Sequence, residues 1–186
     1  MSMPDQKPCA AETTLLPLKL EHQGIVYEDN FKKIEKIHAQ FDGFSKEYFV
    51  SDYGEKAAVV VIKDGNILLA RQYRLLINNL SYEVPAGKIN ENESPQDAAT
   101  RECLEETGIK CQDLHPLINY DPDLEYSKNH THVFHARYLE DISSKDFQCA
   151  WKPLDECLSM IFSGKIADSL SIISIFAYAN TIEKIH

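Results

Sequence analysis

The chain has 186 residues, of which 44% are apolar and 26% are charged. Such a composition is typical of one ordinary globular domain with a modest extension, and it excludes a disordered, collagen-like or coiled-coil chain. The 29 Asp and Glu residues outnumber the 19 Lys and Arg residues, which gives a formal net charge of −10. Because so acidic a chain repels nucleic-acid phosphates and anionic lipids, we expect neither a nucleic acid nor a membrane among its partners.

The cysteines and the apolar segments indicate in which cellular compartment the protein is expected. The five cysteines are scattered and none is spaced as C-x-x-C, which argues against a disulfide framework or a thiolate zinc site and favours reducing surroundings. Residues 1–24 contain no apolar core of a signal peptide, and no later stretch approaches the roughly 20 apolar residues that span a bilayer. We therefore expect a cytoplasmic protein.

The N-terminal quarter of the chain has two possible interpretations. Residues 1–20 contain three prolines and are expected to be a loosely held start. Between residues 25 and 50, apolar side chains at 31, 34, 37 and 41 fit one face of a helix. The turn signal Asp42-Gly43, followed by residues 44–50, is instead typical of a hairpin that enters a strand.

Clearer signals begin at residue 57. Residues 58–62 have the pattern of a buried strand, Asp64-Gly65 predicts a hairpin turn, and residues 67–70 are expected to return as the partner strand. Strands without a regular βαβ alternation predict an α/β domain with a mixed sheet and helices on both faces. The remaining predicted elements are strands over 81–84, 114–120, 130–138 and 147–151 and helices over 94–107, 154–163 and 169–182.

The helix over 94–107 carries an unusual charge pattern. Glu102, Glu105 and Glu106 lie at i, i+3 and i+4, so they project from one face. A solvated charged face is the ordinary interpretation of such a cluster. Like charges at this spacing, however, repel by about 0.2–0.5 kcal/mol per pair, and the helix dipole disfavours anions in the last turn by about 0.3–1 kcal/mol each. A bound divalent cation removes both penalties, and carboxylate oxygens are the ligands that Mg²⁺ or Mn²⁺ prefers.

This segment resembles a known family. The Nudix box is matched at every defining position by Gly87, by Glu93 after five residues, and after seven more by Arg101-Glu102-Cys103-Leu104-Glu105-Glu106-Thr107-Gly108-Ile109. Seven fixed residue types at fixed spacing arise by chance with odds on the order of one in 10⁸. The resemblance implies a Nudix-type α/β/α sandwich in which the box forms a loop–helix–loop that holds divalent metals against a substrate diphosphate.

The resemblance also implies roles for individual residues. Glu102 and Glu106 would be the principal ligands of Mg²⁺ (or Mn²⁺), Glu105 would serve beside them as a ligand and catalytic group, and the Ala86 carbonyl would be a backbone ligand. Glu93 and Arg101 would brace the loop against the helix, and Arg101 can pair with Glu105 at i+4.

Further segments are similar to the ADP-ribose pyrophosphatase branch of this family. The similarity extends over about residues 27–178, and it is carried by residues 69–74, 82–89, 126–127, 132–134, 151–156 and 164–169. It implies a small β-rich N-terminal segment, residues 1–56, that takes part in homodimer formation, and a Nudix hydrolase domain over residues 57–186. It also favours the strand interpretation of residues 25–50.

The implied activity is a metal-dependent cleavage of the diphosphate of ADP-ribose, giving AMP and ribose 5-phosphate, or of a related nucleoside diphosphate sugar. Arg71 is expected to clamp the diphosphate, although a solvated strand end is the simpler interpretation of this cation. Glu83 is expected to bind a ribose hydroxyl or a metal-bound water. Hydrolysis of another nucleotide sugar such as GDP-mannose, and a ligand sensor without hydrolytic activity on the same fold, remain alternatives.

The general base is the least determined residue. Related enzymes carry acidic residues in a loop that corresponds to residues 140–146, and Lys145 stands where a glutamate would align. Asp146 is the expected base, and Asp141 or the acidic residues of 121–125 are the alternatives.

Overall fold

The structure, a computed structural model, describes residues 16–142 and 147–183. The chain divides into two compact units, the first ending at Ser51 and the second beginning at Asp52. Each unit is described by itself. No helix in the described ranges is long and apolar enough to cross a bilayer.

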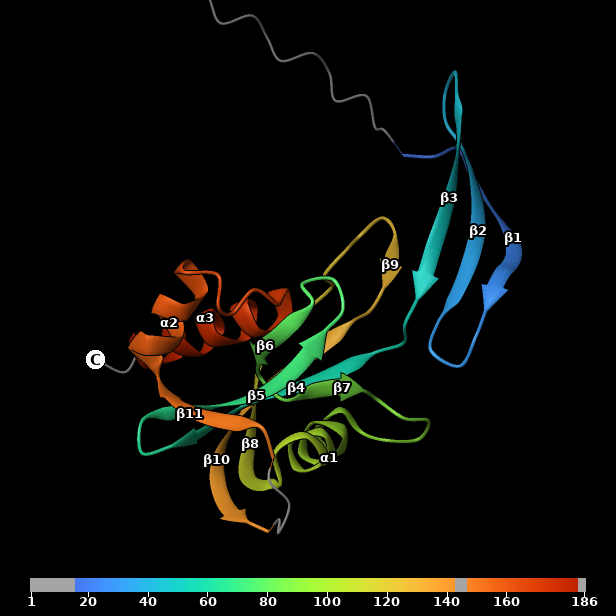
Figure 1. The fold of residues 1–186 in the computed structure, drawn as a ribbon. Helices are drawn as coiled ribbons and strands as arrows, with labels where there is room; N and C mark the ends of the chain where they lie inside the picture. Colours follow the sequence, from blue (N-terminus) through green and yellow to red (C-terminus); the bar gives the residue numbers. More distant parts are fainter. Residues whose placement is uncertain (1–15, 143–146, 184–186) are drawn as a thin grey trace, which may run out of the picture. The chain divides into compact units, whose positions relative to one another are not determined.

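The N-terminal unit is made of strands, as Figure 1 shows. Its strands are β1 (Lys19–Glu28), β2 (Lys33–Gln40) and β3 (Ser45–Asp52), in the order β1-β2-β3, with β1 and β2 antiparallel. The helical alternative for residues 31–41 is therefore wrong. The reason lies in the turns at both ends of β2: Asp29 Oδ1 accepts hydrogen bonds from the Phe31 and Lys32 amides at 2.8 and 2.9 Å, and Gly43 has a φ of 84°. These two turns confine the segment between them to an extended strand, and all eight residues of β2 pair with β1.

The second unit contains a mixed sheet with helices on both faces. The strand order is β11-β5-β4-β10-β8, with β6 paired to β5 and β7 paired to β4. Strands β4 and β10 are parallel, and the other pairs are antiparallel. The elements are β4 (Lys56–Lys63), β5 (Asn66–Arg74), β6 (Asn79–Glu83), β7 (Ala86–Lys88), α1 (Pro95–Thr107), β8 (Ile109–Tyr120), β9 (Ser127–Lys128), β10 (Thr131–Asp141), β11 (Cys149–Pro153), α2 (Leu154–Phe162) and α3 (Ser169–Glu183).

The central strand β4 explains the layered core. Val59 and Val61 are buried on the face covered by α1, whereas Ala58 and Val60 are buried on the face covered by α2 and α3. The apolar run of β4 is continuous because both faces are covered, which is the pattern expected of an interior strand. Figure 1 shows α1 on one side of this sheet and α2 and α3 on the other. The predicted α/β/α sandwich with a mixed sheet is thus confirmed.

Strands β4 and β5 separate soon after their hairpin. They pair only at Ile62 with Ile67 and at Lys63 with Asn66; beyond these positions β5 pairs with β6, and β4 pairs with β7. The chain crosses from β6 to β7 through Val84 and Pro85. This crossing leads directly into the first residues of the Nudix box.

Some elements differ from the expected ones. Strand β7 covers Ala86–Lys88, where no strand was expected, and β8 begins at Ile109 rather than at 114. The first part of β8 alternates along the strand: Ile109 and Cys111 are buried in the core, whereas Lys110 and Gln112 are partly exposed. These residues pair with the end of β10, including Gln112 opposite Arg137, so the strand extends back to the end of α1.

Candidate active site

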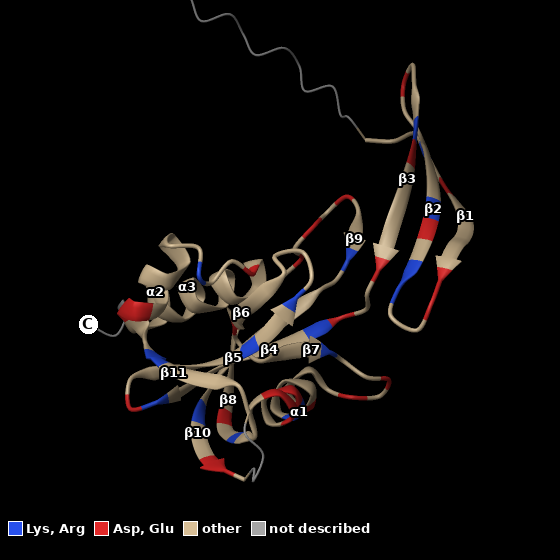
Figure 2. Cartoon of the chain, viewed as in Figure 1, with Lys and Arg blue, Asp and Glu red and all other residues tan. Residues whose placement is uncertain are grey.

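The position of the glutamates of α1 is determined by the capping of both helix ends and by the packing of one helix face against the sheet. Ser94 Oγ accepts a hydrogen bond from the Asp97 amide at 3.1 Å, and Gly108, at a φ of 70°, donates its amide to the Leu104 carbonyl at 2.9 Å. Ala99 and Cys103 are fully buried against the sheet. Figure 2 shows the concentration of acidic residues along this helix.

The Glu102 carboxylate lies against the backbone of Gly87. A β-carbon at residue 87 would be 2.1 Å from Glu102 Cδ, so only glycine allows this approach. The same carboxylate accepts a hydrogen bond from Arg101 Nη1 at 2.6 Å. The first glycine of the box therefore makes room for a glutamate fifteen residues later in the chain.

The Glu106 carboxylate is held at both oxygens. Gln72 Nε2, from β5, donates to Oε1, and the Ala86 amide donates to Oε2 at 3.1 Å. Burial raises the pKa of Glu106 to about 7, and the negative charge of Glu102 acts in the same direction. The two hydrogen bonds and the charge of Arg74 oppose that rise. The carboxylates of Glu102 and Glu106 thus both face the short segment Ala86-Gly87, and nearby positive groups only partly balance their negative charges.

Arg101 connects the loop of the box to its helix. Its Nε and Nη2 donate to the two oxygens of Glu93 at 2.7 and 2.9 Å, and Nη2 also reaches the Lys88 carbonyl at 2.9 Å. These hydrogen bonds, with that of the Asn90 amide, lower the pKa of Glu93 to about 2. Arg101 Nη1 also binds Glu105, whose side chain is 58% exposed. Glu105 is therefore turned toward Arg101 and solvent.

The donor set fits a hard divalent cation that retains waters. Among the described residues, no group of three or more His, Cys, Asp and Glu side chains is arranged to hold a metal ion. What the site offers is two carboxylates, Glu102 and Glu106, beside the backbone of Ala86. Oxygen donors alone suit Mg²⁺ or Mn²⁺, and Mg²⁺ is usually bound through one or two carboxylates with water completing its shell.

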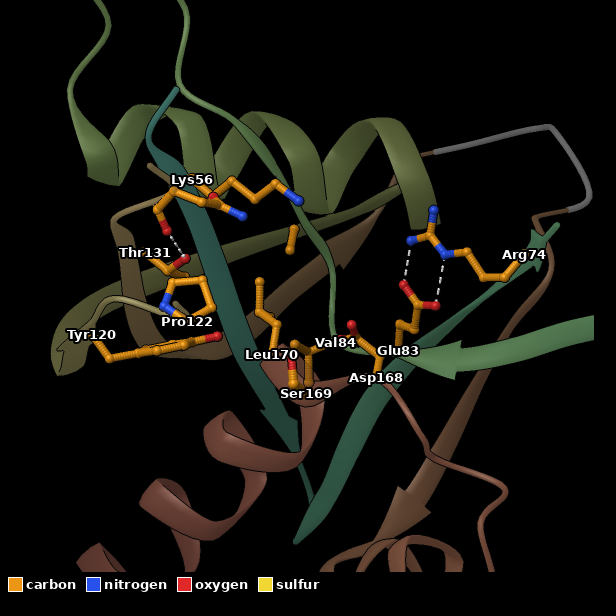
Figure 3. A pocket seen from close by; sticks show the side chains of 12 residues that line it. Lys56, Arg74, Glu83, Val84, Tyr120, Pro122, Thr131, Asp168, Ser169 and Leu170 are labelled. Atoms are coloured by element: carbon orange, nitrogen blue, oxygen red, sulfur yellow. Dashed lines mark hydrogen bonds and ion pairs between the residues drawn. The ribbon is translucent and has the colours of Figure 1, made fainter. Parts of the chain in front are cut away.

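A polar pocket of about 160 Å³ opens where β4, β6 and β10 meet the start of α3 (Figure 3). Arg74 is fixed in it by two hydrogen bonds to Glu83, with Nε 2.8 Å from Oε1. Burial, with the charge of Asp168, raises the pKa of Tyr120 to about 12. The lining residues are Lys56, Arg74, Glu83, Val84, Ala86, Tyr120, Pro122, Asn129, Thr131, Asp168, Ser169 and Leu170.

The structure separates the two arginines of β5. Side chains alternate along a strand, and Leu68 packs on the face of α1 while Leu69 packs on the face of α2 and α3. Gln72 and Arg74 follow Leu68, whereas Arg71 follows Leu69. Arg74, and not Arg71, is among the described residues that line the pocket.

Arg71 does not share the surroundings of Arg74 and lies instead against an aromatic ring. Its guanidinium carbon lies 5.1 Å from the centre of the Tyr82 ring, and its Nε has no hydrogen-bond partner among the described residues. The clamp on a diphosphate assigned to Arg71 remains a prediction. Glu83 does line the pocket, bound to Arg74, and Asp146 lies outside the described residues.

Sequence reasoning did not identify several of the residues gathered here. Gln72 on Glu106 could have been found from the alternation of β5, since it shares a face with Leu68. Lys56, Tyr120 and Asp168 enter the pocket through contacts between distant segments, for which no local signal exists.

Several known proteins are similar to this chain. A sequence model of the NUDIX domain matches residues 53–164. The methanol dehydrogenase activator of Bacillus methanolicus is 29% identical over 138 residues, which cover 70% of this chain and 75% of the relative. The ADP-ribose pyrophosphatase of Mycobacterium tuberculosis is 27% identical over 151 residues, covering 77% and 73%. A solved ADP compounds hydrolase shares the fold with a TM-score of 0.74 and 20% identity over 98% of each chain.

Proposed function

Because the chain belongs to the NUDIX family of hydrolases, we propose that it cleaves the diphosphate of ADP-ribose or of a related nucleoside diphosphate sugar with the help of Mg²⁺ or Mn²⁺. From ADP-ribose the products would be AMP and ribose 5-phosphate. One observation carries the proposal: two carboxylates of one helix face the Ala86-Gly87 backbone, and a polar pocket begins at the same residue, Ala86. The named relatives that act on ADP compounds support it.

The residues of the site would have different roles in the reaction. Glu102, Glu106 and the Ala86 carbonyl would hold the metal, and Gln72 orients Glu106 through its hydrogen bond. When bound, the metal would polarise the phosphoryl oxygens and lower the pKa of the attacking water. Glu105, being exposed and turned to Arg101, would join as a ligand or catalytic group only after leaving that contact. Asp146 as general base stays a prediction.

The pocket would take the sugar side of the substrate. Lys56 and Arg74 are its cations, suited to phosphate oxygens. Glu83, Tyr120 and Asp168 are oxygen-bearing groups, which suit sugar hydroxyls. Among the described residues, the lining contains one aromatic ring, so a nucleobase would lack a second ring to stack against in this pocket.

A substrate panel with matched variants tests the function. The protein is incubated with Mg²⁺ and nucleotide sugars including ADP-ribose and GDP-mannose, dinucleoside polyphosphates and nucleoside triphosphates, and the products are identified. We expect turnover of a nucleoside diphosphate sugar that is lost with EDTA and in Glu106→Gln. Glu156→Gln makes the same change at a glutamate of α2, which is bound to Lys152, and retains the activity.

Three outcomes would contradict parts of the proposal. Absence of any turnover would favour a ligand sensor without hydrolytic activity. Turnover confined to nucleoside triphosphates would refute the substrate class. Full Mg²⁺-dependent activity in Glu106→Gln would refute the assignment of the metal site.

The homodimer is a second part of the proposal. In the N-terminal unit, β1 is exposed over all ten of its residues. Large apolar side chains are exposed across the N-terminal unit, which is unusual for a surface that meets only water. They are Leu18, Leu20, Ile25, Val26, Tyr27, Phe31, Phe44 and Phe49. A second copy of the chain would cover them.

A further inference from the structure

Hydrogen bonds from three different elements reach the backbone of Val84, Pro85 and Ala86. The Ala86 amide donates to Glu106 of α1 at 3.1 Å, and the Pro85 carbonyl accepts from the Val59 amide of β4 at 3.1 Å. The Val84 amide donates to Ser171 Oγ of α3 at 3.0 Å. The segment that carries the proposed backbone ligand is thus tied to both helical layers and to the sheet.

Ser171 is built to make this contact. Its side chain is fully buried, and its hydroxyl donates to Asp168 Oδ2 at 2.9 Å while accepting from Val84. Asp168 Oδ2 also accepts the Ser171 amide at 2.9 Å, as a capping residue does at the start of a helix. Because its proton is committed to Asp168, the Ser171 oxygen presents a lone pair to Val84. Figure 3 shows Val84, Asp168 and Ser169 side by side at this junction.

The segment is stiff enough to transmit a displacement. Pro85 has a fixed φ and restricts Val84 before it to extended conformations. A shift of Val84 is therefore passed to Ala86, two residues on, instead of being absorbed between them. Ala86 in turn meets Glu106 through its amide.

We infer that Ser171, oriented by Asp168, is a positioning residue that sets the backbone of Val84–Ala86 and, through Ala86, the carboxylate of Glu106. The inference rests on the proposed function, since it concerns the same metal site. Ser171 acts through the backbone and touches neither metal nor substrate, and it ties the metal site to the start of α3, where Asp168 and Ser169 also line the pocket.

The chain supplies a matched control on the same helix. Ser174 is also fully buried, and its Oγ has no hydrogen-bond partner among the described residues. Ser171→Ala and Ser174→Ala therefore delete the same atom from equally buried positions of α3. Only the first deletion leaves the Val84 amide without its acceptor.

The experiment measures Mn²⁺ affinity by calorimetry without substrate, together with kcat, KM and Tm, for the wild type, Glu106→Gln and both serine variants. We expect Ser171→Ala to weaken Mn²⁺ binding by about tenfold, the lower end of the range for residues that orient ligands. Its kcat should fall by a similar factor with KM little changed. Ser174→Ala should match the wild type in all of these values.

A second variant separates the hydrogen bond from packing. Ser171→Cys fills the site but offers only a weak acceptor, so it should lose Mn²⁺ affinity as Ser171→Ala does. Wild-type affinity in either Ser171 variant, or an equal loss in Ser174→Ala, would overturn the inference while leaving the proposed function intact. Absence of Glu106-dependent Mn²⁺ binding in the wild type would refute the proposed metal site, and the inference with it.

Discussion

The carboxylate of Glu102 occupies the space that a side chain on Gly87 would need. A β-carbon there would lie 2.1 Å from both Cδ and Oε1 of Glu102. Strand β7 is paired to β4, and α1 is packed on the sheet, so neither backbone can retreat easily. The end of the Glu102 side chain is the part that can move.

Gly87→Ala should therefore displace the carboxylate while the fold survives. We expect kcat/KM to fall by about 100-fold, because a misplacement of about 1 Å at a catalytic group has this effect. The melting temperature should change by less than about 4 °C. Steady-state kinetics and a thermal melt check both expectations.

A double-mutant cycle shows whether Glu102 is the group displaced. In a Glu102→Ala background the new methyl has no carboxylate to push aside, so adding Gly87→Ala should cause little further loss. The same 100-fold factor in both backgrounds would show that the methyl acts elsewhere.

Arg101→Lys should lower activity although the charge is kept. A lysine ammonium cannot bind both oxygens of Glu93 and also reach the Lys88 carbonyl, as the guanidinium does. We expect kcat/KM to fall by about tenfold and the melting temperature to decrease. Kinetics and a melt of the purified variant measure both values.

Arg137→Lys is the matched control for this change. Arg137 binds Asp113 through Nε at 2.8 Å and through Nη2, on the exposed surface of the β8–β10 pair. Its replacement should leave kinetics and melting temperature close to the wild type, since exposed ion pairs contribute little. Equal losses in both variants would indicate a general effect of replacing arginine.

The features of the site that could be predicted from the sequence are those that depend only on residues close together in the chain. Ser94, Pro95 and Gly108 define the ends of α1 by their own backbone and capping chemistry, and the spacing of Glu102 and Glu106 follows from the helix period. These features need no knowledge of the rest of the chain, and all were found where expected.

The rest depends on contacts between distant segments. Arg71 and Arg74 look alike in the sequence, and only the pairing of β5 with β6 and the layers on each side decide which one reaches the pocket. Ser171 meets Val84 across 87 residues. The capping residue Asp168 distinguishes Ser171 from the equally buried Ser174 locally, but nothing in the sequence indicates that Ser171 meets Val84.

Lys56→Met should weaken substrate binding. Lys56 lines the pocket across from the Arg74–Glu83 pair (Figure 3), and no ion pair involves it within the described part of the chain. A charge-assisted contact to phosphate is worth about 1.5–3 kcal/mol, so KM should rise by about 10- to 100-fold with kcat little changed.

Lys63→Met makes the same change at the other end of β4. Lys63 lies over the ring of Tyr138, with 3.9 Å from Nζ to the ring centre, and does not line the pocket. Its variant should keep the wild-type KM. An unchanged KM in Lys56→Met would exclude this lysine from substrate binding.

The N-terminal unit should hold two copies of the chain together. Val26 of β1 is 53% exposed, so Val26→Asp costs the isolated chain little but would place a charge in an apolar interface. We expect the wild type to sediment as a dimer and Val26→Asp to sediment as a monomer at the same concentration. Phe162→Asp, at an 82% exposed apolar residue of α2, is the control and should remain dimeric. A wild type that is monomeric at all concentrations, or a dimer that only Phe162→Asp dissociates, would contradict dimerisation through the N-terminal unit.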